Sequence, residues 1–209
     1  MSVDPLIDVR RYYTDCLRAH GPSARGVDWN SADSQHLRFE QVARVWGGAA
    51  RISVNDIGCG YGAFYDWLLA RGWDCDYLGV DISEAMVTKA RELHASREHC
   101  RFLVGERADR IADYAVASGL FNVKLSAEDA AWRAHLLASL DTLHAGSRLA
   151  FAFNCLTKYS DPSRMQSHLY YADPCELFDH CKRRFSRNVA LLHDYGLYEF
   201  TVIVRKDRP

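Results

Sequence analysis

The stretch "NDIGCGYGAF", residues 55–64, decides the fold of this chain. Three glycines at alternate positions, Gly58, Gly60 and Gly62, follow Asp56 at the end of the apolar run "RISVNDI". A glycine-rich turn between a strand and a helix lets backbone N–H groups approach a ligand closely, as nucleotide-binding loops do. The stretch therefore predicts a nucleotide-like ligand at the carboxyl end of the first strand.

Strands and helices are predicted to alternate on the C-terminal side of this loop. Helices are expected from Ala63, after Ser83 and, from the capping pattern of Ser126 with Asp129, up to Gly146. Such alternation is typical of a parallel sheet with helices on both faces. The strands of that sheet are expected at 51–57, 75–81, 100–104, 112–118 and 147–154.

The end of the chain departs from this alternation. A helix should begin at Asp173 and Pro174 and run to about Phe185, and strands should follow at 188–194 and 198–206. The link at Tyr195 and Gly196 is too short for a crossover between parallel strands. These two strands are therefore expected to pair antiparallel.

Two helices are predicted before the first strand. Asp4 and Pro5 suit the start of a helix over about 5–19, and a second helix should begin after Ser31 or Asp33 and end at Gly47. We expect one domain over 1–209, with a helical lid at 1–48 and a core at 49–209. A long loop at 155–173 within that core is expected to carry substrate specificity.

Composition excludes several classes of protein. The chain has 209 residues and a net charge of -1, so it has no overall electrostatic attraction for nucleic acid. No window reaches the roughly 18 apolar residues that a membrane span requires. The seven cysteines, odd in number and irregularly spaced, are typical of reduced thiols and not of a disulfide framework or a metal site. We expect a cytoplasmic protein that binds neither nucleic acid, membrane nor metal.

Two kinds of ligand are compatible with the glycine loop. Gly58, Gly60 and Ala63 fit the dinucleotide pattern G-x-G-x-x-A, and Asp81 lies about twenty residues further on, which keeps a NAD-dependent oxidoreductase as an alternative. However, the carboxylate of Asp56 would repel a pyrophosphate at this position. A ligand with a cationic group and no phosphate removes the conflict.

Four segments together resemble a known family, the class I (Rossmann-like) S-adenosylmethionine-dependent methyltransferases. They are "VNDIGCGYGAF", "YLGVDISEAMV", "FLVGE" and "YAVASGLFNV", in that order, and the resemblance covers about 52–204. It implies a Rossmann-like methyltransferase fold, an α/β structure whose seven-stranded, mostly parallel sheet has helices on both faces and a C-terminal antiparallel hairpin. It also implies S-adenosyl-L-methionine as cofactor and S-adenosyl-L-homocysteine as its product.

The resemblance assigns cofactor-binding roles to four strand ends. Asp56 and the loop would serve the methionine end of the cofactor, and Asp81 would hold both ribose hydroxyls. Glu106 is the nearest match for the acid that receives the adenine amino group, although the family's Asp-Ala or Asp-Val pair is missing there, and an exposed loop acid is the alternative. The complete predicted set is Asp56, Gly58, Cys59, Gly60, Tyr61, Gly62, Asp81, Ile82, Met86, Glu106, Ser118, Gly119 and Phe121.

Candidates for acceptor binding come from the N-terminal segment, the fourth strand end and the loop at 155–173. His168 is the candidate general base, because a hydroxyl or protonated amine must lose its proton around the time of methyl transfer. The alternatives are that the loop aromatics pack on the core while His168 is exposed to solvent, and that Arg38 forms a salt bridge with a surface acid. The predicted substrate-binding residues are Tyr12, Trp29, Arg38, Asn122, Tyr170 and Tyr171.

The sequence thus predicts an enzyme that moves a methyl group to an oxygen or nitrogen of a small molecule, as a monomer or homodimer. A tetrad of the N-P-P-Y type is absent, which argues against nucleobase methylation. Besides the NAD-dependent oxidoreductase, a second alternative stays open: a non-catalytic S-adenosylmethionine-binding sensor or partner subunit.

Overall fold

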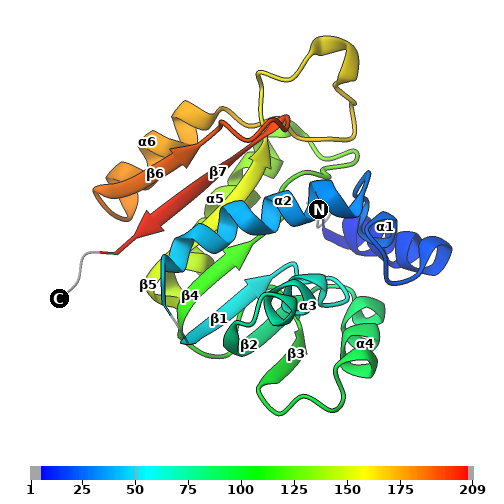
Figure 1. Cartoon of the computed structure of the whole chain (residues 1–209). Coiled ribbons are helices and arrows are strands. Elements are labelled where there is room, and N and C mark those ends of the chain that lie inside the picture. The colour runs from blue at the N-terminus through cyan, green and yellow to red at the C-terminus, as the bar shows by residue number, and fades with distance from the viewer. Residues whose placement is uncertain (1–5, 50, 207–209) are drawn as a thin grey trace.

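The computed structural model describes residues 6–49 and 51–206, which build a seven-stranded sheet between two layers of helices (Figure 1). The strand order is β3-β2-β1-β4-β5-β7-β6, and β7 runs antiparallel to both of its neighbours. The predicted fold class, including the antiparallel hairpin, is confirmed. The strands are β1 (Arg51–Ile57), β2 (Asp74–Asp81), β3 (Cys100–Val104), β4 (Ala112–Ala117), β5 (Ser147–Leu156), β6 (Asn188–Leu192) and β7 (Glu199–Arg205).

Helices cover both faces of the sheet. In Figure 1, α2 crosses in front of the strands, with α3 and α4 on the same side, and α5 and α6 lie behind. Among residues 6–49 and 51–206, no helix combines the length and apolar composition that a membrane crossing needs. The helices are α1 (Leu6–His20), α2 (Ala32–Ala43), α3 (Ala63–Ala70), α4 (Glu84–Leu93), α5 (Asp129–Ala145) and α6 (Pro174–Arg184), with short 3₁₀ turns at Arg25–Val27, Arg44–Trp46 and Pro162–Arg164.

Side-chain caps fix the start of three of these helices. Ser31, Ser83 and Asp173 each accept a hydrogen bond from a backbone N–H in the first turn, as the sequence predicted for the last two. The predicted cap at Ser126 is wrong: Glu128 occupies the N-cap position of α5 without a side-chain cap. A turn closed by Ala127 N–H on the carbonyl of Lys124 comes first and delays the helix. The predicted start of the first helix, at Asp4 and Pro5, lies outside the described residues.

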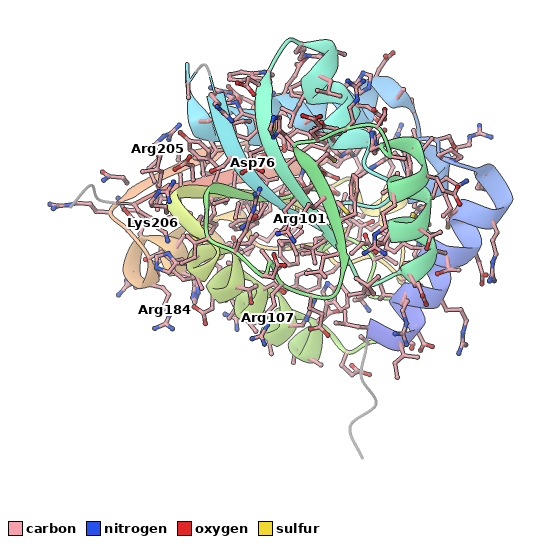
Figure 2. All side chains as sticks on the ribbon, turned by 90° about the horizontal axis from the view of Figure 1, so that it is seen from below. Asp76, Arg101, Arg107, Arg184, Arg205 and Lys206 are labelled. Atoms are coloured by element: carbon pink, nitrogen blue, oxygen red, sulfur yellow. The ribbon has the colours of Figure 1, made fainter. Side chains whose placement is uncertain are left out.

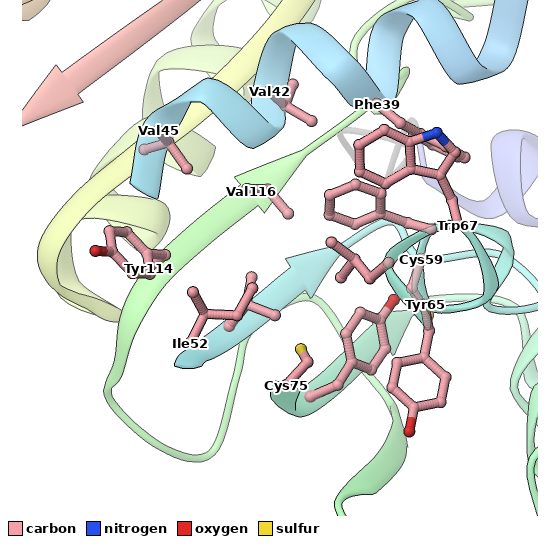
Figure 3. Packing of buried hydrophobic residues seen from close by; sticks show 14 of the residues in the cluster. Phe39, Val42, Val45, Ile52, Cys59, Tyr65, Trp67, Cys75, Tyr114 and Val116 are labelled. Carbon is pink, nitrogen blue, oxygen red and sulfur yellow. The ribbon is translucent and has the colours of Figure 1, made fainter. Parts of the chain in front are cut away.

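The front face of the sheet is covered by α2 and α3 (Figure 3). Phe39 and Val42 of α2 pack on the sheet together with Val45 of the following turn, and all three side chains are buried. Ile52 and Val116 supply the strand side of this cluster. Helix α2 is thus part of the helix layer, and the N-terminal segment is more than a lid laid over a finished core.

The back face of the sheet is covered unevenly. Helices α5 and α6 bury Leu136, Leu140 and Leu177 against β4, β5 and β7. The segment 105–111, which the structure describes throughout, leads from β3 to β4 without a helix. Strands β1 and β2 present polar side chains on this face, among them Asn55 and Asp76. Arg110 connects the two and donates to Asp76 Oδ1 at 2.7 Å and to Asn55 Oδ1 at 3.0 Å. Figure 2 shows Asp76 on β2.

Candidate functional site

A cavity of about 850 Å³ opens at the carboxyl ends of β1, β2 and β4. This is the point where the strand order reverses between β1 and β4, and ligands of open α/β sheets bind at such a switch point. Its volume lies in the range of roughly 300–1,000 Å³ that small-molecule sites occupy. Four groups of residues line it: the glycine loop with the end of β2, the end of β4, the N-terminal helices, and the β3–β4 segment with α5.

The glycine-loop side of the cavity consists of Asp56, Gly58, Cys59, Gly60, Asp81, Ile82 and Met86. The Asp81 carboxylate organises it, because Oδ2 accepts from Gly60 N–H at 2.9 Å and Oδ1 accepts from Ser83 N–H at 2.8 Å. Gly60 has a positive φ of 56°, and a Cβ there would stand 3.0 Å from Val27 Cγ1. The loop therefore requires glycine at this position for its backbone conformation and for the close approach of the N-terminal segment.

Asp56 is a buried carboxyl group with a relative exposure of 3%. Its side-chain partner is the Tyr77 hydroxyl, which donates to Oδ2 at 2.5 Å. Burial raises the pKa of Asp56 to about 7, the Tyr77 hydrogen bond opposes that rise, and the nearby Asp81 carboxylate adds to it. Burial also raises the pKa of Asp81, against the two backbone hydrogen bonds. Two neighbouring carboxyl groups thus lack a cationic partner in the described part of the chain and suit a ligand that brings one.

The end of β4 contributes Ser118, Gly119 and Leu120 to the cavity. The fully buried Asn154 of β5 fixes this turn: its Oδ1 accepts from Gly119 N–H at 2.7 Å, and its Nδ2 donates to Ser118 Oγ at 3.2 Å. Gly119 has a positive φ of 80°, and a Cβ there would stand 2.4 Å from Cζ2 of Trp29. The indole of Trp29 therefore lies directly against this backbone.

The N-terminal helices form the side that we call the N-terminal wall. Helix α1 is tied to the glycine-loop side by a hydrogen bond of 2.8 Å between the hydroxyls of Thr14 and Ser83. Tyr13 packs with Tyr61 and Met86, and burial raises the pKa of its phenol well above the usual value, so the hydroxyl stays protonated. The wall consists of Leu6, Val9, Tyr13, Val27, Trp29, Gln35 and Phe39, all of them uncharged.

We call the last side the β3–α5 side, and it carries the charged lining residues other than Asp56 and Asp81. Glu106, Arg107 and Asp109 line it from the segment after β3, and Figure 2 shows Arg107 there beside α5. Asp109 is paired with Arg101 through two hydrogen bonds of 2.8 and 3.0 Å. Helix α5 adds Trp132, His135, Ala138, Ser139 and Thr142.

Most of the predicted cofactor residues line this cavity in the structure, and three of them do not. Tyr61 is buried beneath α1 against Leu17 and Met86. Gly62 lies behind the loop, where a Cβ would stand 2.8 Å from His94 Nε2. Phe121 is fully buried in the back core, and its carbonyl accepts from Trp132 Nε1. The predicted residues that do line the cavity are Asp56, Gly58, Cys59, Gly60, Asp81, Ile82, Met86, Glu106, Ser118 and Gly119.

Of the predicted substrate residues in the N-terminal segment, Trp29 alone lines the cavity. Tyr12 lies off it and Tyr13 takes its place, because the apolar stripe of α1 faces inward. Arg38 forms an ion pair outside the cavity lining: its Nε donates to Glu199 Oε2 at 2.8 Å, and its guanidinium lies 4.1 Å from the centre of the Trp29 ring. The expectation that Arg38 meets a ligand is therefore corrected to a buried ion pair.

Asn122 belongs to the same buried network and not to the cavity lining. Its Nδ2 donates to Glu199 Oε1 at 3.0 Å, and its Oδ1 accepts from Leu156 N–H at 3.2 Å. Glu199 itself is 1% exposed. The side chain of Asn122 thus connects the end of β4, the end of β5 and the start of β7, and it does not line the cavity.

The loop at 155–173 also stays off the cavity. It folds back on the segment after β4, where the carbonyl of His168 accepts from the N–H groups of Lys124 and Leu125. Tyr170 N–H donates to the carbonyl of Asn122, and the Tyr171 hydroxyl accepts from Gln166 N–H. In Figure 1 this olive segment projects above the ends of β5 and β7, away from α1. His168, Tyr170 and Tyr171 therefore do not line the cavity, and the base expected at His168 is not placed there.

Several lining residues were not predicted. Leu6 and Val9 lie on the apolar stripe of the first helix, where apolar spacing does not distinguish a core from a cavity, and nothing in the sequence singled out Gln35 or Phe39. Tyr77, which donates a hydrogen bond to Asp56, was also not predicted; it lies on β2, where it pairs with Val54 of the parallel neighbour β1.

Comparisons with known proteins agree with this geometry. The family model described as "Methyltransferase domain" matches residues 54–146. The protein named "Putative methyltransferase Rv1506c" from Mycobacterium tuberculosis (strain ATCC 25618 / H37Rv) is 57% identical over 163 residues, which are 78% of this chain and 98% of that protein.

Solved structures share the fold at low sequence identity. The N-methyltransferase NodS from Bradyrhizobium japonicum WM9, in complex with S-adenosyl-L-homocysteine, superposes with a TM-score of 0.65 at 10% identity, over 98% of this chain and 100% of that one. The structure titled "DhpI-SAM-HEP complex" gives a TM-score of 0.62 at 14% identity, over 98% and 96%. With the sheet order, the closing hairpin and the 57% identical relative, these findings show that the chain belongs to the class I, Rossmann-like S-adenosylmethionine-dependent methyltransferases.

Proposed function

We propose that this protein transfers the methyl group of S-adenosylmethionine to an oxygen or nitrogen atom of a small-molecule acceptor. One observation carries the proposal: a single cavity joins two carboxyl groups, the buried Asp56 and the half-buried Asp81, to the uncharged N-terminal wall. The first side suits a cationic cofactor with ribose hydroxyls, and the second leaves room for an acceptor beside it.

The residues of the glycine-loop side would hold the cofactor. Asp56 would accept from the ammonium group of its methionine part, which supplies the missing counter-charge. Asp81 would accept from the ribose hydroxyls with the lone pairs that Gly60 and Ser83 leave free. A pyrophosphate in the same place would meet two carboxylates, and this disfavours the NAD-dependent alternative. Ile82 and Met86 would flank the adenine, and Glu106 lies on the β3–α5 side where it would reach the amino group.

S-adenosylmethionine supplies, when bound, an activated methyl group on a good leaving group. The protein's remaining work is to hold the acceptor in line and to exclude water, which is worth several kcal/mol by orientation alone. The N-terminal wall is placed for both tasks, because Trp29 closes the cavity against Gly119 and α1 is tied to Ser83. Ser118 and Gly119, fixed by Asn154, would face the reacting atoms from the end of β4.

The size of the cavity supports a small acceptor. About 850 Å³ accommodates a cofactor and a modest second molecule, and α1 and α2 cover it from the N-terminal side. One solved relative of the same fold is an N-methyltransferase by its title. We also propose a cytoplasmic location, which the seven free thiols support. The oligomeric state, monomer or homodimer, stays a prediction.

Calorimetry and turnover together test the proposal. Titration with S-adenosylhomocysteine should give saturable binding, whereas NAD should give none. Transfer of label from methyl-labelled S-adenosylmethionine to a panel of small hydroxyl and amine acceptors should follow. Binding of NAD alone would refute the assignment of the cavity. Tight binding of S-adenosylhomocysteine with no transfer to any acceptor would instead favour the non-catalytic sensor.

A further inference from the structure

Charge is distributed unevenly around the cavity. The charged residues that the structure describes along it are Asp56, Asp81, Glu106, Arg107 and Asp109. All of them belong to the glycine-loop side or to the β3–α5 side, which the cofactor would occupy. The N-terminal wall and the end of β4 present apolar and aromatic side chains together with a few neutral hydrogen-bonding groups, among them the hydroxyl of Tyr13 and the amide of Gln35.

The arginine nearest to the wall is unavailable to an anionic acceptor. Arg38 is 7% exposed, and its charge is balanced by Glu199, which is 1% exposed. The guanidinium also stacks on Trp29 from behind the wall, 4.1 Å from the ring centre. A carboxylate or phosphate on the acceptor would therefore leave water without a partner, and burying an unpaired charge is costly.

A cationic acceptor would also lack a counter-charge on the N-terminal wall. The indole of Trp29, the best cation-binding ring of the wall, already carries the guanidinium of Arg38. The carboxyl groups of Asp56 and Asp81 are those that the cofactor itself requires, and the Asp28 carboxylate, which acts on the phenols of Tyr12 and Tyr13, does not line the cavity. The phenol of Tyr13 stays protonated, so it acts as a neutral donor or acceptor and not as a counter-charge.

We infer that the acceptor is an uncharged molecule with an apolar body, bound against Trp29 and Phe39, and that Gln35 and Tyr13 recognise it through neutral polar groups. Its nucleophilic atom therefore arrives with a free lone pair. This inference rests on the proposed function, because it takes the carboxylate side of the cavity as the place of the cofactor.

A set of probes that share an aromatic body and carry a neutral, an anionic or a cationic polar group tests the inference. With the protein saturated with S-adenosylhomocysteine, binding of 2-naphthol, 2-naphthoate and 2-naphthylmethylammonium is measured by calorimetry or ligand-observed NMR. We expect the neutral probe to bind tighter than either charged one by about tenfold or more, since neither charge finds a partner. Equal or tighter binding of the anion or the cation, or failure of the neutral probe to bind, would overturn the inference.

An isosteric change of charge gives a second, independent arm. Gln35→Glu places a carboxylate on the wall, and we expect it to reverse the preference toward the ammonium probe. Gln41→Glu is the matched control, because Gln41 is buried on the same helix but does not line the cavity and is bonded by Arg44. An ammonium preference that appears equally in both variants, or in neither, would contradict the conclusion that the charge of the residue at position 35 determines which probe binds.

The failure of this inference is distinguishable from failure of the proposed function. Loss of S-adenosylhomocysteine binding in the unmodified protein would remove the proposed function together with the inference. Intact binding of S-adenosylhomocysteine combined with a preference for charged probes would remove the inference alone.

Discussion

The glycine-loop side and the N-terminal wall face the same cavity, but they meet it with different chemistry. The first presents backbone N–H groups and the carboxyl groups of Asp56 and Asp81, all from segments between β1 and α4. The second presents apolar and aromatic side chains from α1, α2 and the turn between them. One side is built by the path of the backbone, and the other by how two helices dock.

This difference separates what each side can do. A ligand site made of loop backbone and carboxylates is defined once β1 and β2 pair, because the Gly60–Asp81 hydrogen bond spans those two strands. The N-terminal wall instead depends on distant contacts, such as Arg38 with Glu199 at the start of β7. We therefore expect changes in the wall to alter acceptor use and stability, and changes in the glycine loop to alter cofactor affinity.

The largest effect should come from the ion pair behind the wall. Glu199→Gln removes the charge that balances Arg38 while keeping the size of the side chain. Because one partner of a buried pair is left uncompensated, we expect the free energy of unfolding to fall by about 3 kcal/mol, measured by denaturant titration.

A surface pair is the matched control for that change. Arg133 and Glu176 also form an ion pair, but their side chains are 43% and 48% exposed. Glu176→Gln should cost less than about 1 kcal/mol. Equal losses in the two variants would mean that the Arg38–Glu199 pair does not hold the N-terminal wall.

The next largest effect should appear on the other side of the cavity. Asp81→Ala removes the acceptor of the Gly60 and Ser83 N–H groups together with the proposed acceptor of the ribose hydroxyls. We expect S-adenosylhomocysteine to bind about 100-fold more weakly in calorimetry, because hydrogen bonds to a charged group are lost. Asp81→Asn, which keeps one acceptor oxygen, should lie between. Unchanged affinity in Asp81→Ala would remove the assignment of the ribose site.

The comparison of the two sides also explains what the sequence could predict. Asp56, Gly60 and Asp81 lie at strand ends whose position follows from local patterns, so their convergence at one sheet edge was predictable. Tyr61 and Gly62 belong to the same loop, yet the turn that leads into α3 directs Tyr61 toward α1 and places Gly62 against His94. The local sequence pattern thus predicted where the site lies, but it did not predict which way every residue of the loop faces.

The N-terminal wall was predictable only in part. A first helix over about 5–19 was predicted, but whether its apolar face meets a core or a cavity depends on where the helix docks. The loop at 155–173 shows the opposite error. Its length and aromatic content suggested a substrate site, whereas backbone hydrogen bonds to Asn122 and Lys124 hold it against the segment after β4. Such long-range pairing leaves no periodic trace in the sequence.

A third prediction concerns the point where the two sides meet. Gly119→Ala puts a Cβ 2.4 Å from Trp29 Cζ2 and also strains a backbone with φ of 80°. Gly196→Ala is the matched control, since φ is 70° there and nothing stands within 4 Å of the new Cβ. The strain of about 1 kcal/mol is common to both, and the clash should cost Gly119→Ala about 2 kcal/mol more in thermal or denaturant unfolding. In a Trp29→Ala background this excess should vanish, and its persistence would contradict the contact.

The smallest expected effect isolates the charge of Asp56. Because its pKa is raised to about 7 in the ligand-free protein, a ligand whose ammonium group pairs with this carboxylate must displace a proton to bind below that pH. Between pH 8 and pH 6 the ionised fraction falls by about tenfold, so the affinity for S-adenosylhomocysteine should fall by up to about tenfold as well.

The stability of the ligand-free protein should change with pH in the opposite direction, because a carboxyl group with a raised pKa contributes stability at low pH that is lost as pH rises toward 7. The stabilisation that the ligand gives in thermal unfolding should therefore grow with pH. Asp56→Asn should abolish this dependence, and if the variant kept it, the titrating group would be Asp81, whose pKa burial also raises.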